Sequence, residues 1–254
     1  MTKSRQTRNA FSPATIRALA RDGVHEKVIG YLRDKPRGEV LDIPTGLGAL
    51  AEVLHGMKFH VSCCDIDTAQ FLANGLMVDR GDLNGRIPYE DGKFDYVCFL
   101  EAIEHTENPY NAVRELARVL KPGGTLILST PNYLNIERRL KFLVTGFFTR
   151  PVSREMFLND CQGKTYGLHM SPMGYTLIRF ALEHAGLDIR TVTYDKKKPK
   201  QMFLKPVVWL IRLYIKFWPE KKRAKYWLGE TSGSDILEGG NTLIIFAEKP
   251  LKGV

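Results

Sequence analysis

The chain has 254 residues, of which 44% are hydrophobic, and it carries a formal net charge of +9. This length and hydrophobic content fit one large α/β domain with insertions and argue against two full domains. Residues 1–9 are basic and polar without an apolar core, so they are not predicted to be a signal peptide, and a cytoplasmic location is expected. The four cysteines include no Cys-x-x-Cys pair, which excludes a metal site of that type.

The excess positive charge is concentrated in one segment. From Asp195 to Lys225 there are eleven lysines or arginines and two acidic residues, whereas the rest of the chain holds 26 basic and 26 acidic residues. The whole net charge therefore lies in this part of the sequence, which points to an acidic or membrane-surface partner there.

The N-terminal part of the chain alternates predicted helices and strands. Residues 1–35 are expected to contain leading helices that pack on a sheet. A first strand is predicted over 38–43, and a helix over 49–55 follows it. A second apolar run, 59–64, is the next predicted strand and ends in Asp65.

The middle of the chain continues this alternation. A short apolar segment at 76–78 precedes residues 94–100, which are almost all apolar, as expected of a parallel strand that is covered on both faces. A helix is predicted over 111–120 from apolar residues at helical spacing, and a strand is predicted over 125–130. The pattern then weakens, and we interpret residues 133–170 as an insertion that covers the substrate.

The C-terminal part is predicted to end in two strands. A helix is expected over 171–186, with Pro172 in its first turn and a glycine at its end. The last two strands are predicted over 187–194 and 242–248, and the basic, amphipathic insertion of residues 195–234 separates them.

The strand that ends at Asp42 leads directly into a turn with Gly46 and Gly48. Because glycine lacks a Cβ, the backbone there can turn sharply and approach a nucleoside-type ligand. Asp65 follows twenty-three positions after Asp42, a distance that suits a carboxylate accepting from both hydroxyls of a ribose. The spacing Gly46-x-Gly48-x-x-Ala51 also matches the dinucleotide fingerprint, so NAD-dependent enzymes remain an alternative at this point.

Four segments occur in a more specific order, namely 40–48, 81–82, 91–100 and 120–132. Together they resemble the class I S-adenosylmethionine-dependent methyltransferases, in the branch with a Pro-x-Gly variant of the first motif. The resemblance implies an α/β, Rossmann-like, mostly parallel seven-stranded sheet with a terminal antiparallel strand pair. Helices are expected on both faces, with helical insertions in addition. A terminal antiparallel pair is a feature that dinucleotide dehydrogenases lack.

The resemblance also implies a set of cofactor contacts. Asp42, Gly46 and Gly48 would line the methionine end of S-adenosylmethionine, Asp65 would hold the ribose, and Asp82 would hold the adenine amine. Further contacts are expected from Pro44, Ile66, Leu83 and Leu100. The commoner family pattern has Gly-Cys at positions 44 and 45, and the proline here removes an N–H donor and stiffens the turn.

After the 94–100 strand the chain reads Glu101-Ala102-Ile103-Glu104-His105. This pattern resembles small-RNA 2′-O-methyltransferases and ubiquinone-pathway O-methyltransferases, where such residues and a later histidine hold a divalent ion. The resemblance implies Glu101, Glu104, His105 and His169 as ligands, a set of oxygen and nitrogen donors that suits Mn²⁺, Fe²⁺ or Zn²⁺ better than Mg²⁺. The alternative is a metal-free site in which Glu104 and His105 are catalytic and His105 acts as a base or orients a loop.

A helix predicted over 202–218 has an unusual distribution of charge. Lys205, Arg212 and Lys216 fall within about 40° of one another on a helical projection, and apolar residues cover the rest. One interpretation is a helix that lies in the plane of an anionic membrane surface, at the inner face of the membrane. The other is a cover over the active site or a subunit interface. Nucleic acid is not favoured because no RNA-binding motif is present, and the oligomeric state stays open.

These patterns predict an S-adenosylmethionine-dependent methyltransferase. Its acceptor is expected to be oxygen of a hydroxylated small molecule, a sugar or a lipid-linked intermediate. The alternative from another class is a non-catalytic protein that keeps the fold as a cofactor-binding or interaction module. The sequence does not identify the acceptor.

Overall fold

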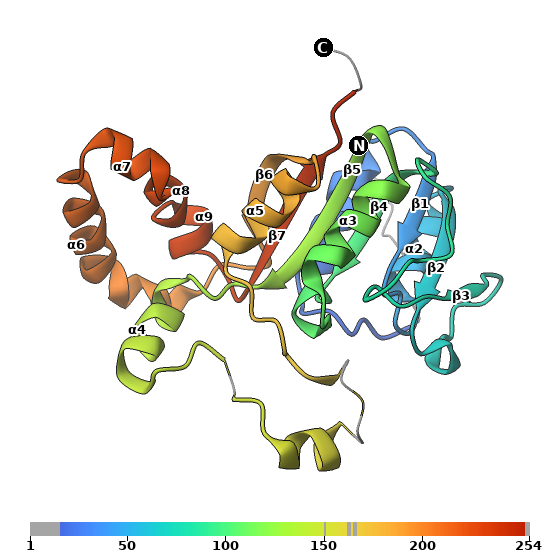
Figure 1. The fold of residues 1–254 in the computed structure, drawn as a ribbon, viewed down its shortest axis with the longest axis horizontal. Helices are drawn as coiled ribbons and strands as arrows, with labels where there is room; N and C mark the ends of the chain where they lie inside the picture. Colours follow the sequence, from blue (N-terminus) through green and yellow to red (C-terminus); the bar gives the residue numbers. More distant parts are fainter. Residues whose placement is uncertain (1–15, 150, 162–163, 165–166, 252–254) are drawn as a thin grey trace, which may run out of the picture.

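A computed structural model describes residues 16–149, 151–161, 164 and 167–251, and its centre is a seven-stranded sheet (Figure 1). The strands are β1 Glu39–Asp42, β2 His60–Asp65, β3 Val78–Arg80, β4 Phe94–Leu100, β5 Leu120–Pro131, β6 Asp188–Tyr194 and β7 Thr242–Glu248. Their order is β3-β2-β1-β4-β5-β7-β6. β7 runs antiparallel to both β5 and β6, whereas the pairs among the first five strands are parallel. The predicted Rossmann-like sheet with a terminal antiparallel pair is confirmed.

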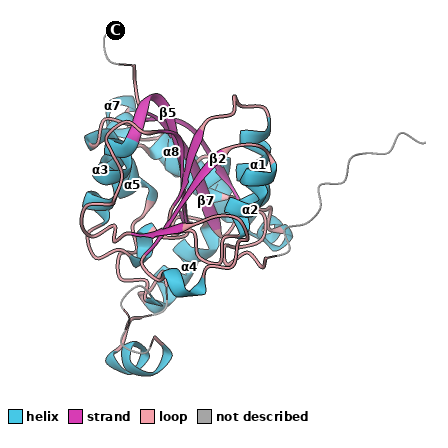
Figure 2. Ribbon diagram, turned by 90° about the vertical axis from the view of Figure 1, so that its right-hand side faces the viewer, coloured by secondary structure: helices cyan, strands magenta, loops and turns pink. Residues whose placement is uncertain are grey.

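Helices cover both faces of the sheet (Figure 2). α1 Val24–Arg33 and α2 Ala49–Gly56 pack on one face, and α3 Pro109–Val119 and α5 Tyr175–His184 pack on the other. The central strand β4 explains the two cores, because successive side chains of a strand point to opposite faces. Its Val97 and Phe99 belong to the α3/α5 core, while Cys98 and Leu100 belong to the α1/α2 core.

The two insertions form a separate group of helices. The first contains α4 Ile136–Thr145 and a single π-helical turn, Met156–Asp160. The second contains a 3₁₀ segment Pro199–Leu204, α6 Lys205–Lys216, α7 Glu220–Lys225, α8 Leu228–Thr231 and α9 Ser234–Leu237. Short 3₁₀ turns also occur at Thr68–Gln70 and Ile103–His105. Figure 1 shows α4 to the lower left of the arrowhead of β5, with α6 above α4 at the far left.

Several predicted boundaries are wrong. In the leading region the described helix is α1, residues 16–23 form turns and irregular backbone, and residues 1–15 lie outside the described part of the chain. In the apolar segment 76–78, Met77 is 90% exposed while Leu76 and Val78 are partly buried, and strand β3 begins only at Val78.

The helix expected over 171–186 begins later, at Tyr175. Ser171 N donates to Glu104 O at 3.0 Å, and Ser171 Oγ donates to Thr106 O at 2.7 Å. Since these bonds tie Ser171 to the segment after β4, the predicted proline-containing first turn does not form, and Gly174 becomes the N-cap residue.

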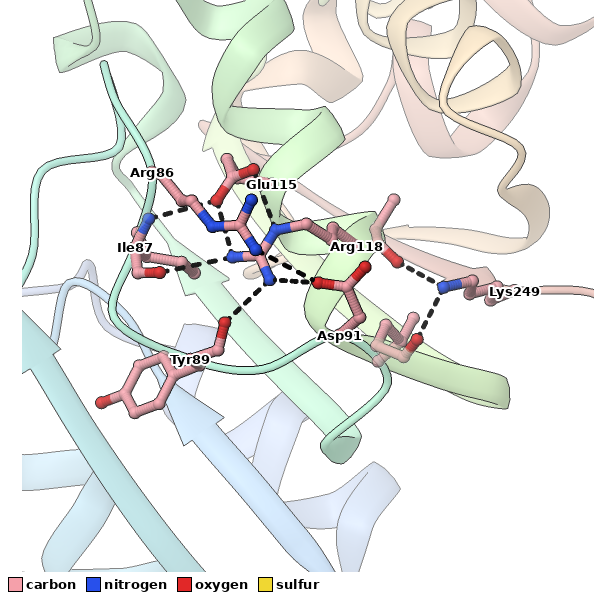
Figure 3. Close-up of polar contacts among 9 residues, drawn as sticks. Arg86, Ile87, Tyr89, Asp91, Glu115, Arg118 and Lys249 are labelled. Carbon is pink, nitrogen blue, oxygen red and sulfur yellow. Dashed lines mark hydrogen bonds and ion pairs between the residues drawn. The ribbon is translucent and has the colours of Figure 1, made fainter.

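A network around Arg118 fixes the loop between β3 and β4 to α3 (Figure 3). The guanidinium donates to both oxygens of Glu115, to the Asp91 carboxylate at 2.7 Å and to Tyr89 O at 2.7 Å. Glu115 in turn accepts from Ile87 N at 3.1 Å. This loop follows Asp82 and Leu83 in the chain, so the network holds the end of that segment in place.

A close backbone contact connects the basic insertion to β7. A Cβ on Gly240 would lie 1.7 Å from Asp195 Oδ1 and 2.6 Å from Lys196 O. Asp195 is buried and accepts from Thr242 N at 3.2 Å. Only glycine therefore fits where the insertion returns to the sheet.

We expect Gly240→Ala to lower the free energy of unfolding by about 1–3 kcal/mol, because the new methyl group must displace buried backbone and carboxylate atoms. Gly30→Ala in α1 is the matched control, since a Cβ there meets no atom within 4 Å and should stabilise the helix by about 0.5–1 kcal/mol. Thermal and urea unfolding of both variants measure the difference. Equal stabilities would contradict the close contact.

Candidate functional site

A cavity of about 580 Å³ opens at the carboxyl ends of β1, β2 and β4, within the usual size range for small-molecule sites. All but one of the residues predicted to bind a cofactor or a metal line it. They are Asp42, Pro44, Gly46, Asp65, Ile66, Asp82, Leu83, Leu100, Glu101, Glu104, His105 and His169.

Gly48 is the exception and has a packing role. Its φ is +88°, and a Cβ there would lie 2.7 Å from Phe71 Cε2 and 2.8 Å from the Ala73 Cβ. It is the N-cap residue of α2. The missing side chain therefore lets the 71–73 segment lie close to the start of α2, and it does not open the cavity directly.

The turn after β1 is held by hydrogen bonds from its own residues. Thr45 Oγ1 donates to Asp42 Oδ2 at 2.9 Å, and Thr45 N donates to Cys64 O at 3.0 Å. The Ile43–Pro44 peptide bond is cis. Thr45 thus has a clear structural role at one of the two positions where the turn departs from the commoner pattern.

Asp42 is buried at the base of this turn. Burial raises the pKa of Asp42 to about 7, while the hydrogen bond from Thr45 opposes the shift and the nearby Asp65 charge adds to it. A cationic group of a ligand placed beside Asp42 would favour the ionised carboxylate. The side chain is therefore suited to an ammonium group.

Asp65 joins the turns that follow β1 and β2. Its Oδ2 accepts from Gly46 N at 2.8 Å, and its Oδ1 accepts from Asp67 N at 2.9 Å. Each carboxylate oxygen has a second lone pair, so two ligand hydroxyls can still be accepted. Asp82, by contrast, is exposed and lies at the rim of the cavity, where its Oδ1 accepts from Asn84 N at 2.8 Å.

Glu104, His105 and His169 form a cluster at the other end of the cavity. One possible ligand atom from each residue lies within 4.8 Å of those of the other two. Glu104 is 1% exposed, and Thr130 Oγ1 donates to its Oε2 at 3.2 Å. His105 Nδ1 lies 3.0 Å from Leu168 O, which fixes the orientation of the ring. The two imidazole rings meet edge to face, with centroids 4.7 Å apart.

The electrostatics of this cluster follow from its burial. Burial, with a smaller contribution from Glu101, raises the pKa of Glu104 to about 8. Burial and the neighbouring His105 lower the pKa of His169 to about 4, so this imidazole is neutral at physiological pH. A neutral imidazole and a buried carboxyl fit the donor set of a divalent metal ion.

Glu101 does not join this cluster. Thr242 Oγ1 donates to Glu101 Oε1 at 2.9 Å, and the Glu101 Oε2 pairs with Arg21 Nε at 3.7 Å. Its φ of +49° is a strained conformation for a residue with a side chain, which turns the chain sharply at the end of β4. The structure thus brings together three of the four predicted metal ligands and directs the fourth toward the N-terminal segment.

The irregular segment before α1 also lines the cavity, and sequence reasoning missed it. Arg17, Leu19 and Arg21 all line the site. A Cβ on Gly46 would lie 3.1 Å from Leu19 Cδ1, so Leu19 covers the glycine turn. No periodic pattern marks these residues, and Arg21 is distant from any predicted strand in the sequence. For both reasons the sequence did not indicate that they line the cavity.

Comparisons with known proteins identify the family of this domain. The sequence model of a methyltransferase-domain family matches residues 14–192, which is more than two thirds of the chain. A ubiquinone biosynthesis O-methyltransferase from Marinobacter nauticus is 30% identical over 173 residues, covering 60% of this chain and 65% of that protein. A chloroplastic tocopherol O-methyltransferase from Arabidopsis thaliana is 32% identical over 116 residues, covering 41% of this chain and 33% of that protein.

The first curated relatives are matched over 44% to 65% of their own length. Among solved structures, an S-adenosylmethionine-dependent methyltransferase from Mesorhizobium loti superimposes with a TM-score of 0.56 at 17% identity, covering 89% of this chain and 97% of that one. Such low identity supports the fold alone. By its matched domain, its sheet topology and its relatives, the chain belongs to the class I S-adenosylmethionine-dependent methyltransferase family.

Proposed function

We propose that this protein transfers a methyl group from S-adenosylmethionine to an oxygen of a hydroxylated small molecule or lipid-linked acceptor. The observation that carries the proposal is the Glu104, His105 and His169 cluster in the same cavity as the cofactor-type turn. The two curated relatives described above are both named O-methyltransferases, which supports oxygen as the acceptor atom.

The cofactor is proposed to lie along the carboxyl edge of β1 and β2. Asp42 would accept from the ammonium group of its methionine part, and Asp65 would accept from the ribose hydroxyls. Asp82 at the rim would accept from the adenine amine. In this arrangement the buried acids lie at the methionine and ribose parts, and the exposed acid lies at the base.

At the acceptor end, Glu104, His105 and His169 are proposed to hold a divalent metal ion. When bound, such an ion acts as a Lewis acid that lowers the pKa of an acceptor hydroxyl. The buried Glu104 carboxyl and the neutral His169 ring supply one oxygen and one nitrogen, and the hydrogen bond at His105 Nδ1 orients that ring. A mixed nitrogen and oxygen set favours Mn²⁺, Fe²⁺ or Zn²⁺ over Mg²⁺.

Methyl transfer needs little else from the protein than in-line placement and exclusion of water. Leu19 over the glycine turn and Arg21 paired with Glu101 close the side of the cavity formed by the N-terminal segment. These contacts are proposed to keep the reacting groups aligned.

Replacement of Asp65 by alanine should weaken binding of S-adenosylhomocysteine by roughly 10- to 150-fold, because a charged hydrogen-bond acceptor contributes about 1.5–3 kcal/mol. Calorimetric titration measures this. Asp65→Asn keeps one acceptor oxygen and should lose less. NADH titrated in parallel should give no heat, and unchanged affinity of Asp65→Ala would mean that another residue binds the ribose.

The affinity for S-adenosylhomocysteine should also depend on pH. The pKa of Asp42 is about 7 without ligand and should fall when an ammonium group binds beside it. Affinity is then highest above pH 7 and decreases as the pH falls below it, because the ligand must displace a proton. Calorimetry in buffers of different ionisation enthalpy should detect proton release, and Asp42→Asn should abolish both effects. A flat profile in the wild type would separate Asp42 from the ammonium group.

Chelation of divalent metal should abolish turnover while the affinity for S-adenosylhomocysteine stays the same. Formation of S-adenosylhomocysteine over a panel of hydroxylated acceptors measures turnover, and calorimetry with Mn²⁺ or Zn²⁺ measures metal binding directly. His169→Ala should lose turnover and metal binding. His60→Ala is the control at the exposed start of β2, and it should retain turnover and metal binding. Full turnover in excess EDTA would leave His105 as a metal-free base or orienting residue.

A further inference from the structure

α6 is apolar on its outer face as well as on its inner face. On the inner side Val208 is 3% exposed and packs with Ile136 of α4 and Leu237 of α9, with Leu204 and Ile211 beside it. The opposite side carries four large side chains that are between 56% and 78% exposed. They are Trp209, Leu210, Tyr214 and Phe217.

The geometry of the helix separates these two faces. At 100° per residue the four exposed side chains span about 140° of the circumference, on the side opposite Leu204, Val208 and Ile211. Exposed apolar groups that occur singly are ordinary, but a contiguous face of aromatic and aliphatic side chains indicates an interaction site.

A second exposed apolar group lies at the end of α4. Leu143 is 79% exposed, Val144 is 82% exposed and Phe147 is 50% exposed. α4 and α6 share one small core through Ile136 and Val208, so the two groups belong to one structural unit (Figure 1). The four exposed side chains of α6, namely Trp209, Leu210, Tyr214 and Phe217, are called the docking face, and Leu143, Val144 and Phe147 are a second exposed apolar group on the same unit.

Cations lie beside the docking face, and the predicted stripe of Lys205, Arg212 and Lys216 is exposed on α6. Arg212 is exposed as well, but its charge is already paired, because its guanidinium donates to Ser232 O at 3.0 Å and to Glu238 Oε2 at 2.5 Å. The other exposed cations of these two helices are Lys205 and Lys216 on α6 and Lys221, Lys222 and Lys225 on α7. From residue 205 to residue 225, seven basic residues stand against the single acid Glu220.

This charge distinguishes between the candidates for an occupant. A second copy of the chain would bring two clusters of the same sign together, which is unfavourable. An anionic lipid surface is complementary to the lysines, and tryptophan and tyrosine favour the boundary between headgroups and acyl chains. Among the described residues no helix has the length and apolar content needed to cross a bilayer.

We propose that the docking face, together with the lysines of α6 and α7, binds an anionic lipid bilayer with α6 lying in the plane of the membrane. Trp209, Leu210, Tyr214 and Phe217 would enter the headgroup boundary, while the lysine side chains reach the phosphates. The same end of the molecule carries α4, which follows the carboxyl edge of β5 (Figure 1). The proposal concerns a surface of the two insertions, and it does not depend on the proposed methyl transfer.

Co-sedimentation of the full chain with vesicles tests the proposal. Binding is expected to vesicles of phosphatidylcholine with phosphatidylglycerol, to weaken as salt increases, and to be much weaker with phosphatidylcholine alone. Lys221→Gln, Lys222→Gln and Lys225→Gln should each lower the partition coefficient by about fivefold. Trp209→Ser combined with Phe217→Ser should lower it by about tenfold or more.

The control removes the same charge elsewhere. Lys27→Gln, Lys58→Gln and Lys93→Gln are exposed substitutions outside both insertions and should leave binding nearly unchanged. The substituted side chains are all exposed, so thermal unfolding should be the same for every variant. The proposal would be overturned if the wild type did not bind anionic vesicles. It would also be overturned if the control lysine substitutions lowered the partition coefficient as much as those in α7. A dimer in solution that dissociates in the Trp209→Ser and Phe217→Ser variant would also overturn the proposal, because the docking face would then bind a second copy of the chain.

Discussion

The arrangement of the site depends on the two hydrogen bonds that the Asp65 carboxylate accepts. One comes from Gly46 N after β1 and the other from Asp67 N after β2, so a single buried side chain holds both turns at the carboxyl edge of the sheet. Neither turn is regular structure, so the carboxylate supplies the acceptors that a helix or sheet would otherwise give to these two backbone N–H groups. The group proposed to bind the ribose therefore also builds the walls of the cavity.

At the other end of the cavity, burial shifts the pKa values of the residues proposed to bind a metal ion. Glu104 is buried within the α3/α5 side of the sheet edge, where its pKa rises to about 8, and the pKa of His169 falls to about 4. Both shifts arise because burial removes the charged form of each side chain from water, which is unfavourable in free energy. Clusters of residues with such pKa shifts are typical of functional sites. The strained φ of Glu101 belongs to the same segment and directs its carboxylate away from the cluster toward Arg21 and Thr242.

The two insertions differ from the sheet in how far their large apolar side chains are buried. In the sheet, every large apolar side chain of β4 is buried, because helices cover both faces. In α4 and α6 the inner side chains fill a small core with α9, and comparable side chains remain on the outside. The proposed membrane contact would account for this exposed aromatic face, because contiguous exposed apolar patches mark interaction sites.

The sequence by itself determined the sheet and the family, and nearly all the site residues that it predicted line the cavity. Strand periodicity and the glycine turn are local patterns, and acids at the ends of parallel strands must meet at one edge, which is why Asp42, Asp65 and Glu104 were placed correctly along the cavity. Only the tertiary structure decided which distant groups meet. It directed Glu101 toward Arg21 and Thr242, paired Arg212 with Glu238 and brought the segment before α1 over Gly46. Those contacts join loops far apart in the chain, whose paths depend on packing and not on any repeating pattern.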